Sequence, residues 1–258
     1  MEDTECISRR CNDMDIDILV RIFQNLNIFE LTFGVGQVCQ TWRMAACDPL
    51  LWKTLDMSLL KSNFIKIPLE PYVCPKLRRL IMPAWNRIKK TGICRAIEAW
   101  GELESLTMPS ISNSPYLIEQ ISSSCKNFSE LKIMGPCDVL FASSLATFLP
   151  DLKVLSLRCS NLSRDALLII LDGMMGLEVL NISHCMIVEV PPYPGARRVL
   201  TELDNGLIER ASRLKGFITC MSGSCEMCRR TRNDEGLMRW YKYEEDLWRV
   251  DEVASLAF

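Results

Sequence analysis

Hydrophobic positions recur along the chain at an interval of about 25 residues. The clearest unit is Leu177-Glu-Val-Leu180-Asn-Ile182, in which apolar residues occupy the first, fourth and sixth positions. The same triplet recurs upstream, with first positions spaced 24 to 26 residues apart from residue 77 onward. The earlier triplets are Leu152/Leu155/Leu157, Phe128/Leu131/Ile133, Leu103/Leu106/Met108, Leu77/Leu80/Met82 and Trp52/Leu55/Met57. A fixed period of this length predicts six stacked structural units over residues 52–200.

Each unit is expected to hold a short strand followed by a helix. Alternate strand residues point to one face, so the apolar triplet would point into the molecule. Helical apolar spacing follows in residues 91–100, 116–125, 139–148 and 164–174. Ser163 provides an N-cap for the last of these helices. No unit buries its apolar face alone, so each would be stabilised by stacking on its neighbours.

The residues between the apolar strand positions are expected to face outward on the concave side of the stack. This row is mixed and uncharged on balance, which favours a protein-binding surface over a phosphate-binding one. An ordinary solvated face is the alternative interpretation. The candidate substrate contacts in the row are Arg79, Ile81, Lys132, Met134, Arg158 and Asn181.

The N-terminal segment has the spacing of three helices. Apolar residues at 14, 18, 19, 22, 23 and 26 predict the first helix, with Asn12 or Asp13 as its N-cap. A second helix is expected over residues 30–39, and a third over 40–47, before Asp48-Pro49. Three helices in about 40 residues make a small core. Part of their apolar surface should therefore be covered by a partner or by the following repeats.

The residues of this segment resemble an F-box. The resemblance rests on Asp17-Ile-Leu-Val-Arg-Ile-Phe23, Val38-Cys39-Gln-Thr-Trp42-Arg43 and Asp48-Pro49-Leu50-Leu51-Trp52. The usual opening Leu-Pro-x-Glu stands here as Met14-Asp15-Ile16-Asp17, so the proline is lost. With the repeat triplets directly behind it, the chain is similar to plant F-box/leucine-rich-repeat proteins.

This resemblance implies an α/β fold class with a defined layout. It would consist of a three-helix F-box, a short leucine-rich-repeat solenoid of about six strand-helix units, and a C-terminal helical or irregular cap. The expected domain boundaries are 1–11 for a flexible N-terminus, 12–51 for the F-box, 52–200 for the repeats and 201–258 for the cap segment.

The resemblance also implies a function, which is that of a substrate adaptor in an SCF-type ubiquitin ligase. The F-box would dock on a Skp-type linker protein of a cullin-RING ligase, and the repeats would hold the protein to be ubiquitinated. A leucine-rich-repeat scaffold outside any ligase is the alternative. By analogy, the following residues form the linker-binding surface or the core beneath it, two roles that spacing alone does not separate: Met14, Ile18, Leu19, Ile22, Phe23, Leu26, Val38, Cys39, Trp42, Leu51 and Trp52.

Composition and charge narrow the function further. The formal net charge is −2, so no global field favours nucleic acid or an anionic membrane as partner. No apolar run approaches the roughly 20 residues of a membrane helix. The acidic start without an apolar region predicts no secretory signal, and 13 cysteines are then expected to be reduced in the cytoplasm or nucleus. With one histidine and no phosphate-binding glycine loop, neither an enzyme nor a cofactor is expected.

The C-terminal segment departs from the repeat pattern. Residues 201–215 predict one amphipathic helix that caps the stack. The motif Cys220-x4-Cys225-x2-Cys228 follows, and thiolates at the Cys-x-x-Cys spacing can bind zinc. A closed site needs a fourth ligand, which His184 or Cys185 would have to supply. Ordinary packed cysteines are therefore the preferred interpretation over zinc or a redox pair, and His184 is expected to form structural hydrogen bonds.

Overall fold

The computed structural model describes residues 13–58, 76–82, 90–109, 114–191, 195–234 and 251–257. The expected flexible N-terminus, residues 1–11, lies outside these ranges. Within the described part of the chain, every helix is too short or too polar to cross a lipid bilayer.

The N-terminal helical module contains α2 (Ile16–Phe23), α3 (Gln40–Ala46) and the 3-10 helix η3 (Pro49–Trp52). The α-helix predicted over residues 30–39 is wrong. A π-helical turn, η1 (Glu30–Gly34), and a 3-10 turn, η2 (Val35–Gln37), stand in its place. Gly34 and Gly36 explain the irregularity, because glycine is a poor helix former within a helix.

The start of α2 also differs from the expected cap. Asp15, and not Asn12 or Asp13, is the N-cap residue, and its Oδ1 accepts a hydrogen bond of 2.8 Å from the backbone N–H of Asp17. A short acceptor at this position satisfies a backbone N–H that the helix leaves free. The helix therefore begins without the proline of the usual F-box opening.

A parallel sheet runs through the rest of the molecule in chain order. Its order is β1-β2-β3-β4-β6-β8-β11. The middle apolar residues of the six triplets are cross-strand neighbours, as in the pair Leu155 and Leu180. The strands are β1 (Thr54–Asp56), β2 (Arg79–Ile81), β3 (Ser105–Pro109), β4 (Glu130–Met134), β6 (Val154–Ser156), β8 (Val179–Asn181) and β11 (Gly216–Ile218).

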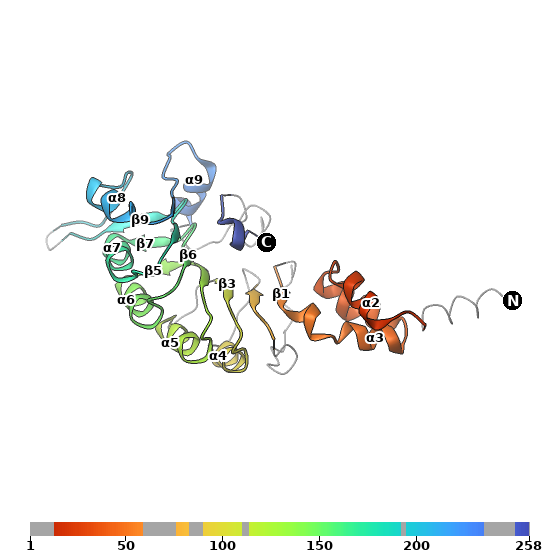
Figure 1. Cartoon of the computed structure of the whole chain (residues 1–258). Coiled ribbons are helices and arrows are strands. Elements are labelled where there is room, and N and C mark those ends of the chain that lie inside the picture. The colour runs from red at the N-terminus through yellow and green to blue at the C-terminus, as the bar shows by residue number, and fades with distance from the viewer. Residues whose placement is uncertain are drawn as a thin grey trace.

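Four helices line the outer, convex side of this curved sheet (Figure 1). They are α4 (Lys90–Ala99), α5 (Ser114–Ser124), α6 (Val139–Phe148) and α7 (Arg164–Gly173), within two residues of the predicted ranges. The triplet leucines and the inner faces of the helices form one continuous buried core. Ser163 is the N-cap residue of α7 as expected, but its side chain makes no capping hydrogen bond.

A second, smaller sheet was not anticipated. Its order is β10-β9-β7-β5, with β5 (Pro136–Cys137), β7 (Asn161–Ser163), β9 (Met186–Glu189) and β10 (Arg198–Val199). Gly135, Cys159 and His184 occupy the same place in successive repeats and all have positive φ, of 140°, 59° and 59°. These residues turn the chain from a strand of the large sheet toward the small one.

The end of the array differs from the single helix predicted over residues 201–215. Helix α8 (Asn205–Ala211) is shorter, and the chain continues into β11, which pairs with β8 as a further parallel strand. Leu207, Ala211 and Leu214 are buried, whereas Ile208 is exposed. Helix α9 (Glu226–Asn233) follows, and the 3-10 helix η6 (Ala254–Leu256) lies near the C-terminus.

Trp52 joins the N-terminal module to the array. Its ring packs against the core of the helical module and against the core of the array. Its Nε1 donates a hydrogen bond of 2.9 Å to the carbonyl oxygen of Ala46 at the end of α3. The first triplet therefore begins inside the helical module, as the overlapping sequence patterns predict.

Candidate functional site

Helix α2 presents two apolar faces. Leu19 and Phe23 are 0% and 1% exposed and form the core of the module, whereas Ile18 and Ile22 are 53% and 49% exposed. Residues four apart lie next to each other on a helix. Ile18 and Ile22 therefore form an adjacent pair on the outer face of the helix, which we call the α2 patch.

The residues predicted to bind a linker protein separate into three groups by burial. The exposed group, which a partner could contact, contains Met14, Ile18, Ile22 and Val38. The buried group contains Leu19, Phe23 and Leu51, and the half-buried group contains Leu26, Cys39, Trp42 and Trp52. Sequence spacing could not make this separation, because both faces of α2 are apolar.

The core behind the α2 patch fixes the helix. The ring of Phe23 meets that of Trp42 edge to face, with centroids 5.4 Å apart and an interplanar angle of 64°. Aromatic pairs prefer such edge-to-face packing over a stacked sandwich. Helix α2 is thereby held against α3, so the α2 patch lies on an ordered element.

The exposure expected for the concave row is wrong. Lys132, Arg158 and Asn181 are fully buried, Ile81 and Met134 nearly so, and Arg79 is partly buried. The C-terminal segment, residues 251–257, contacts Arg79, Lys132 and Asn181, and Figure 1 shows η6 on the inner side of the curved sheet.

Polar contacts hold the C-terminal segment on the strands. The side-chain nitrogen of Asn181 donates to the carbonyl oxygen of Asp251 at 3.0 Å and to the carboxylate of Glu252 at 2.9 Å. The ammonium of Lys132 lies 2.5 Å from Glu252, and both side chains are fully buried. Arg79 donates to the carbonyl oxygen of Ser255. Three of the six predicted substrate contacts therefore bind this segment of the same chain.

Burial determines the electrostatics of this contact. Desolvation lowers the pKa of Lys132 to about 8, although the neighbouring carboxylate of Glu252 acts in the opposite direction. The nearby guanidinium of Arg158 also disfavours the charged form, so burial and this repulsion together outweigh the attraction of Glu252. The pair is specific in position and is not a large source of stability.

A second polar cluster lies beyond β8. One ligand atom from each of His184, Cys220, Cys225 and Cys228 can be chosen so that all four lie within 4.8 Å of one another. The sequence suggests the three cysteines as ligands, with His184 or Cys185 as the fourth. The fold brings His184 to the cysteines. The alternative ligand, Cys185, is outside the group because its thiol donates to the carbonyl oxygen of Leu157 at 3.0 Å.

The three thiols do not share one environment. Burial would raise the pKa of Cys225, but hydrogen bonds from the backbone N–H of Cys228 and from the side chain of Cys220 outweigh it, and the pKa is lowered. Burial, together with the hydrogen bond to Cys220, raises the pKa of Cys228 well above its usual range. Cys225 is the N-cap residue of α9, where the helix dipole also favours a thiolate.

Comparison with known proteins identifies the two parts of the chain. The F-box-like family matches residues 16–58, which include α2, α3 and β1. An F-box/LRR-repeat protein of Arabidopsis thaliana is 51% identical and aligns over 96% of this chain and 96% of its own length. The chain belongs to the F-box/leucine-rich-repeat family. A putative F-box protein of the same plant is 23% identical over 95% of this chain and 96% of its own, and its putative F-box/LRR-repeat protein 22 is 26% identical over 66% and 67%.

The α2 patch belongs to the F-box, since Ile18 and Ile22 lie within the matched residues. The match begins at Ile16, directly after the Met14-Asp15 step at which the sequence departs from the usual opening. It also includes β1, so the F-box and the first strand of the array share residues.

Proposed function

We propose that this F-box/LRR protein is the substrate-recognition adaptor of an SCF-type ubiquitin ligase and catalyses no reaction itself. The observation that carries the proposal is the α2 patch, an exposed apolar pair inside the F-box on a helix whose other face is packed. A Skp-type linker protein would cover the patch, and the array would hold a protein substrate. This function is exercised in the cytoplasm or nucleus, where the cysteines stay reduced.

Burial of the α2 patch supplies part of the affinity. Full burial of an aliphatic side chain contributes about 1.5–3 kcal/mol, and each isoleucine has about half its surface left to bury. Val38 adds exposed apolar surface elsewhere in the module. Because these contacts are apolar, linker binding should change little between low and moderate salt.

The array supports the second half of the role. We infer a leucine-rich-repeat solenoid of about six strand-helix units, a layout that the strand register and the four outer helices favour. Trp52 joins its core to that of the F-box, so a bound substrate would be held in a fixed direction from the linker. On the inner side, the surface offered to a substrate includes the C-terminal segment, which contacts Arg79, Lys132 and Asn181.

The test is co-purification of the full chain with a Skp-type linker and its cullin. Ile18→Glu with Ile22→Glu should abolish linker binding while the thermal unfolding midpoint stays near that of the wild type, because both sites are exposed. The control places the same charges on the array with Leu140→Glu and Met175→Glu, which are 65% and 73% exposed. These should leave linker binding intact.

Two results would count against the proposal. Retention of linker by the folded Ile18→Glu, Ile22→Glu variant would remove the α2 patch from the interface. Recovery of the linker without any cullin would favour the alternative, an interaction scaffold outside the ligase.

A further inference from the structure

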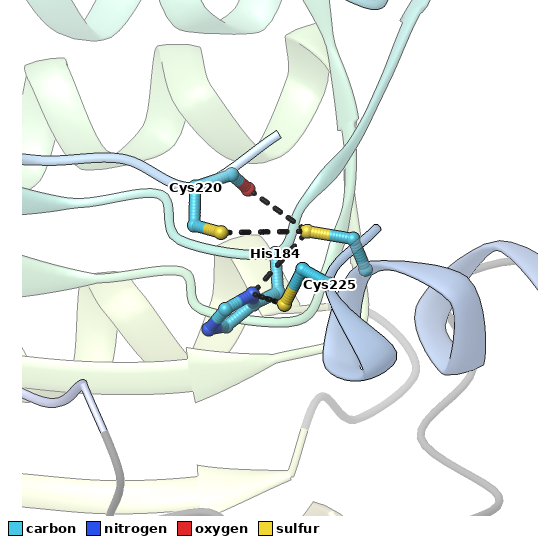
Figure 2. Close-up of side chains that lie close together, drawn as sticks. His184, Cys220 and Cys225 are labelled. Atoms are coloured by element: carbon cyan, nitrogen blue, oxygen red, sulfur yellow. Dashed lines mark hydrogen bonds between the residues drawn. The ribbon is translucent and has the colours of Figure 1, made fainter. Parts of the chain in front are cut away.

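The cluster of His184 with three cysteines has the dimensions of a tetrahedral metal site. The Nδ1 atom of His184 lies 3.3 Å from the sulfur of Cys228 and 3.5 Å from that of Cys225. The sulfurs of Cys228 and Cys220 are 3.7 Å apart. Figure 2 shows the imidazole and the cysteine side chains converging from separate segments.

These separations can be compared with those that one zinc ion imposes. Zn–S bonds of about 2.3 Å and a Zn–N bond of about 2.0–2.1 Å in tetrahedral geometry place sulfurs about 3.8 Å apart, and sulfur and nitrogen about 3.6 Å apart. The observed distances of 3.7, 3.5 and 3.3 Å lie close to these values. The distance of 3.7 Å between the sulfurs of Cys228 and Cys220 is far longer than the roughly 2.05 Å of a disulfide.

The backbone positions the four ligands independently of any metal. His184 lies in the left-handed turn after β8, and its backbone N–H donates to the carbonyl oxygen of Cys220 at 2.9 Å. Cys225 is the N-cap residue of α9 and Cys228 lies in the first turn of that helix. The site therefore ties the last strands of the array to α9.

The second nitrogen of the imidazole has a carboxylate partner. Nε2 of His184 lies 3.2 Å from Oδ2 of Asp251, the first described residue of the C-terminal segment. A metal-binding histidine commonly donates its other N–H to a carboxylate, which fixes the tautomer and orients the ring. Here that pattern would place the proton on Nε2 and leave the lone pair of Nδ1 directed at the thiols.

We propose that Nδ1 of His184 and the thiolates of Cys220, Cys225 and Cys228 bind one structural Zn²⁺ ion. Four protein ligands close the coordination sphere, which is the arrangement of structural and not catalytic zinc sites. Thiolates with imidazole select zinc over Mg²⁺ or Ca²⁺. Binding releases the three thiol protons to solvent, and the complex carries a net charge of −1. The buried guanidinium of Arg158 acts electrostatically on His184 and would offset that charge.

The test is the metal content of the full chain, purified with its linker under reducing conditions. Elemental analysis should give one zinc per chain. Exchange for Co²⁺ should give the visible bands of a tetrahedral thiolate complex. Cys225→Ser with Cys228→Ser should lose both signals, whereas Cys47→Ser, at an exposed free cysteine of the F-box, should keep them.

A second measurement needs no variant and covers the case in which the cysteine variants do not fold. X-ray absorption at the zinc edge of the wild-type protein should show three sulfur neighbours and one nitrogen. Absence of zinc from the reduced protein with no uptake on titration, an oxygen-only first shell, or a stable Cys225–Cys228 disulfide in its place would overturn the proposal. Linker binding is read separately, so failure here leaves the adaptor function untouched.

Discussion

At the scale of single residues, His184 shows how a repeat position acquires a new use. Its counterparts Gly135 and Cys159 share the positive φ that turns the chain between the two sheets. This turn needs a residue that tolerates positive φ, and histidine is among the residues enriched in the left-handed region. The repeat pattern places His184 at this turn. The approach of Cys220 could not be predicted, because it depends on the pairing of β11 with β8.

The carboxylate of Asp251 gives the first prediction. Asp251→Asn should weaken zinc binding about 10–100-fold, because a neutral amide oxygen accepts a weaker hydrogen bond from Nε2–H of His184 than the carboxylate does and orients the ring less firmly. Competition with a chromophoric chelator measures the change. Asp151→Asn, at an exposed aspartate of the array, should leave the affinity as it is. Equal affinities for both variants would show that the 3.2 Å contact does not orient the ring.

Gly176 gives a second prediction at this scale. A Cβ atom there would lie 2.7 Å from the carbonyl oxygen of Pro150 and 2.8 Å from the Cα of Asp151, and backbone atoms cannot move aside cheaply. Gly176→Ala should therefore lower the free energy of unfolding by about 1–3 kcal/mol. Gly101→Ala is the control, since its nearest contact, 3.6 Å, is ordinary. Denaturant unfolding compares the two, and equal stabilities would contradict the prediction.

At the scale of elements, the sequence correctly predicts those helices and strands whose apolar residues follow a regular spacing. Helices α4 to α7 and the strands of the six triplets lie where the apolar spacing places them. The small sheet was missed because strands of two to four residues, such as β5, are too short to show an alternation. Strand β11 was missed because Gly216-Phe-Ile carries no triplet, and its position follows from the pairing with β8.

The exposure of the concave row was predicted wrongly for a related reason. Alternation predicts correctly that Lys132 and Asn181 point away from the leucine core. It cannot show that a distant segment will cover them, since residues 251–257 have no periodicity that links them to the strands. From the sequence alone, the charged and amide side chains of this row therefore suggest an exposed surface.

The ion pair between the C-terminal segment and β4 gives a third prediction. Lys132→Met leaves the carboxylate of Glu252 without its cation, which costs about 3–5 kcal/mol for a buried pair or else releases the segment. Lys132→Met with Glu252→Gln should recover most of the loss, since the amide can still accept from Asn181. Denaturant unfolding together with limited proteolysis of residues 251–257 would measure both.

The matched control is an exposed ion pair of similar length. Lys215 and Glu178 lie 2.6 Å apart with 74% and 36% of their side-chain surfaces exposed. Lys215→Met should therefore have a much smaller effect than Lys132→Met. A double variant no more stable than Lys132→Met would show that the buried charges are not coupled.

At the scale of the whole molecule, the two cores are joined at one end, and the C-terminal segment crosses the inner side of the array from Asn181 on β8 to Arg79 on β2. Trp52 connects the F-box to the array, while His184 and its cysteine partners connect β8 to α9 and, through Asp251, to the C-terminal segment. The zinc cluster and the α2 patch thus lie at opposite ends of the array (Figure 1). Linker binding and metal binding should accordingly be independent.

Removal of the metal gives the fourth prediction. A strong chelator should lower the thermal unfolding midpoint and increase cleavage after residue 218, because Cys220, Cys225 and Cys228 lose the ion that joins them to His184. Linker binding through the F-box should persist. The same treatment of the Cys225→Ser, Cys228→Ser variant is the control and should produce no further change. Loss of linker binding on chelation would show that the two ends are coupled.

The buried contact between Lys132 and Glu252 also sets the order in which the molecule is completed. Lys132 leaves the ribosome before Glu252, which lies 120 positions further along the chain, so β4 must wait during synthesis for its ionic partner. A transcript truncated just before residue 251 would still encode the whole F-box. Its product would keep the α2 patch but lack Glu252, the carboxylate that lies against Lys132.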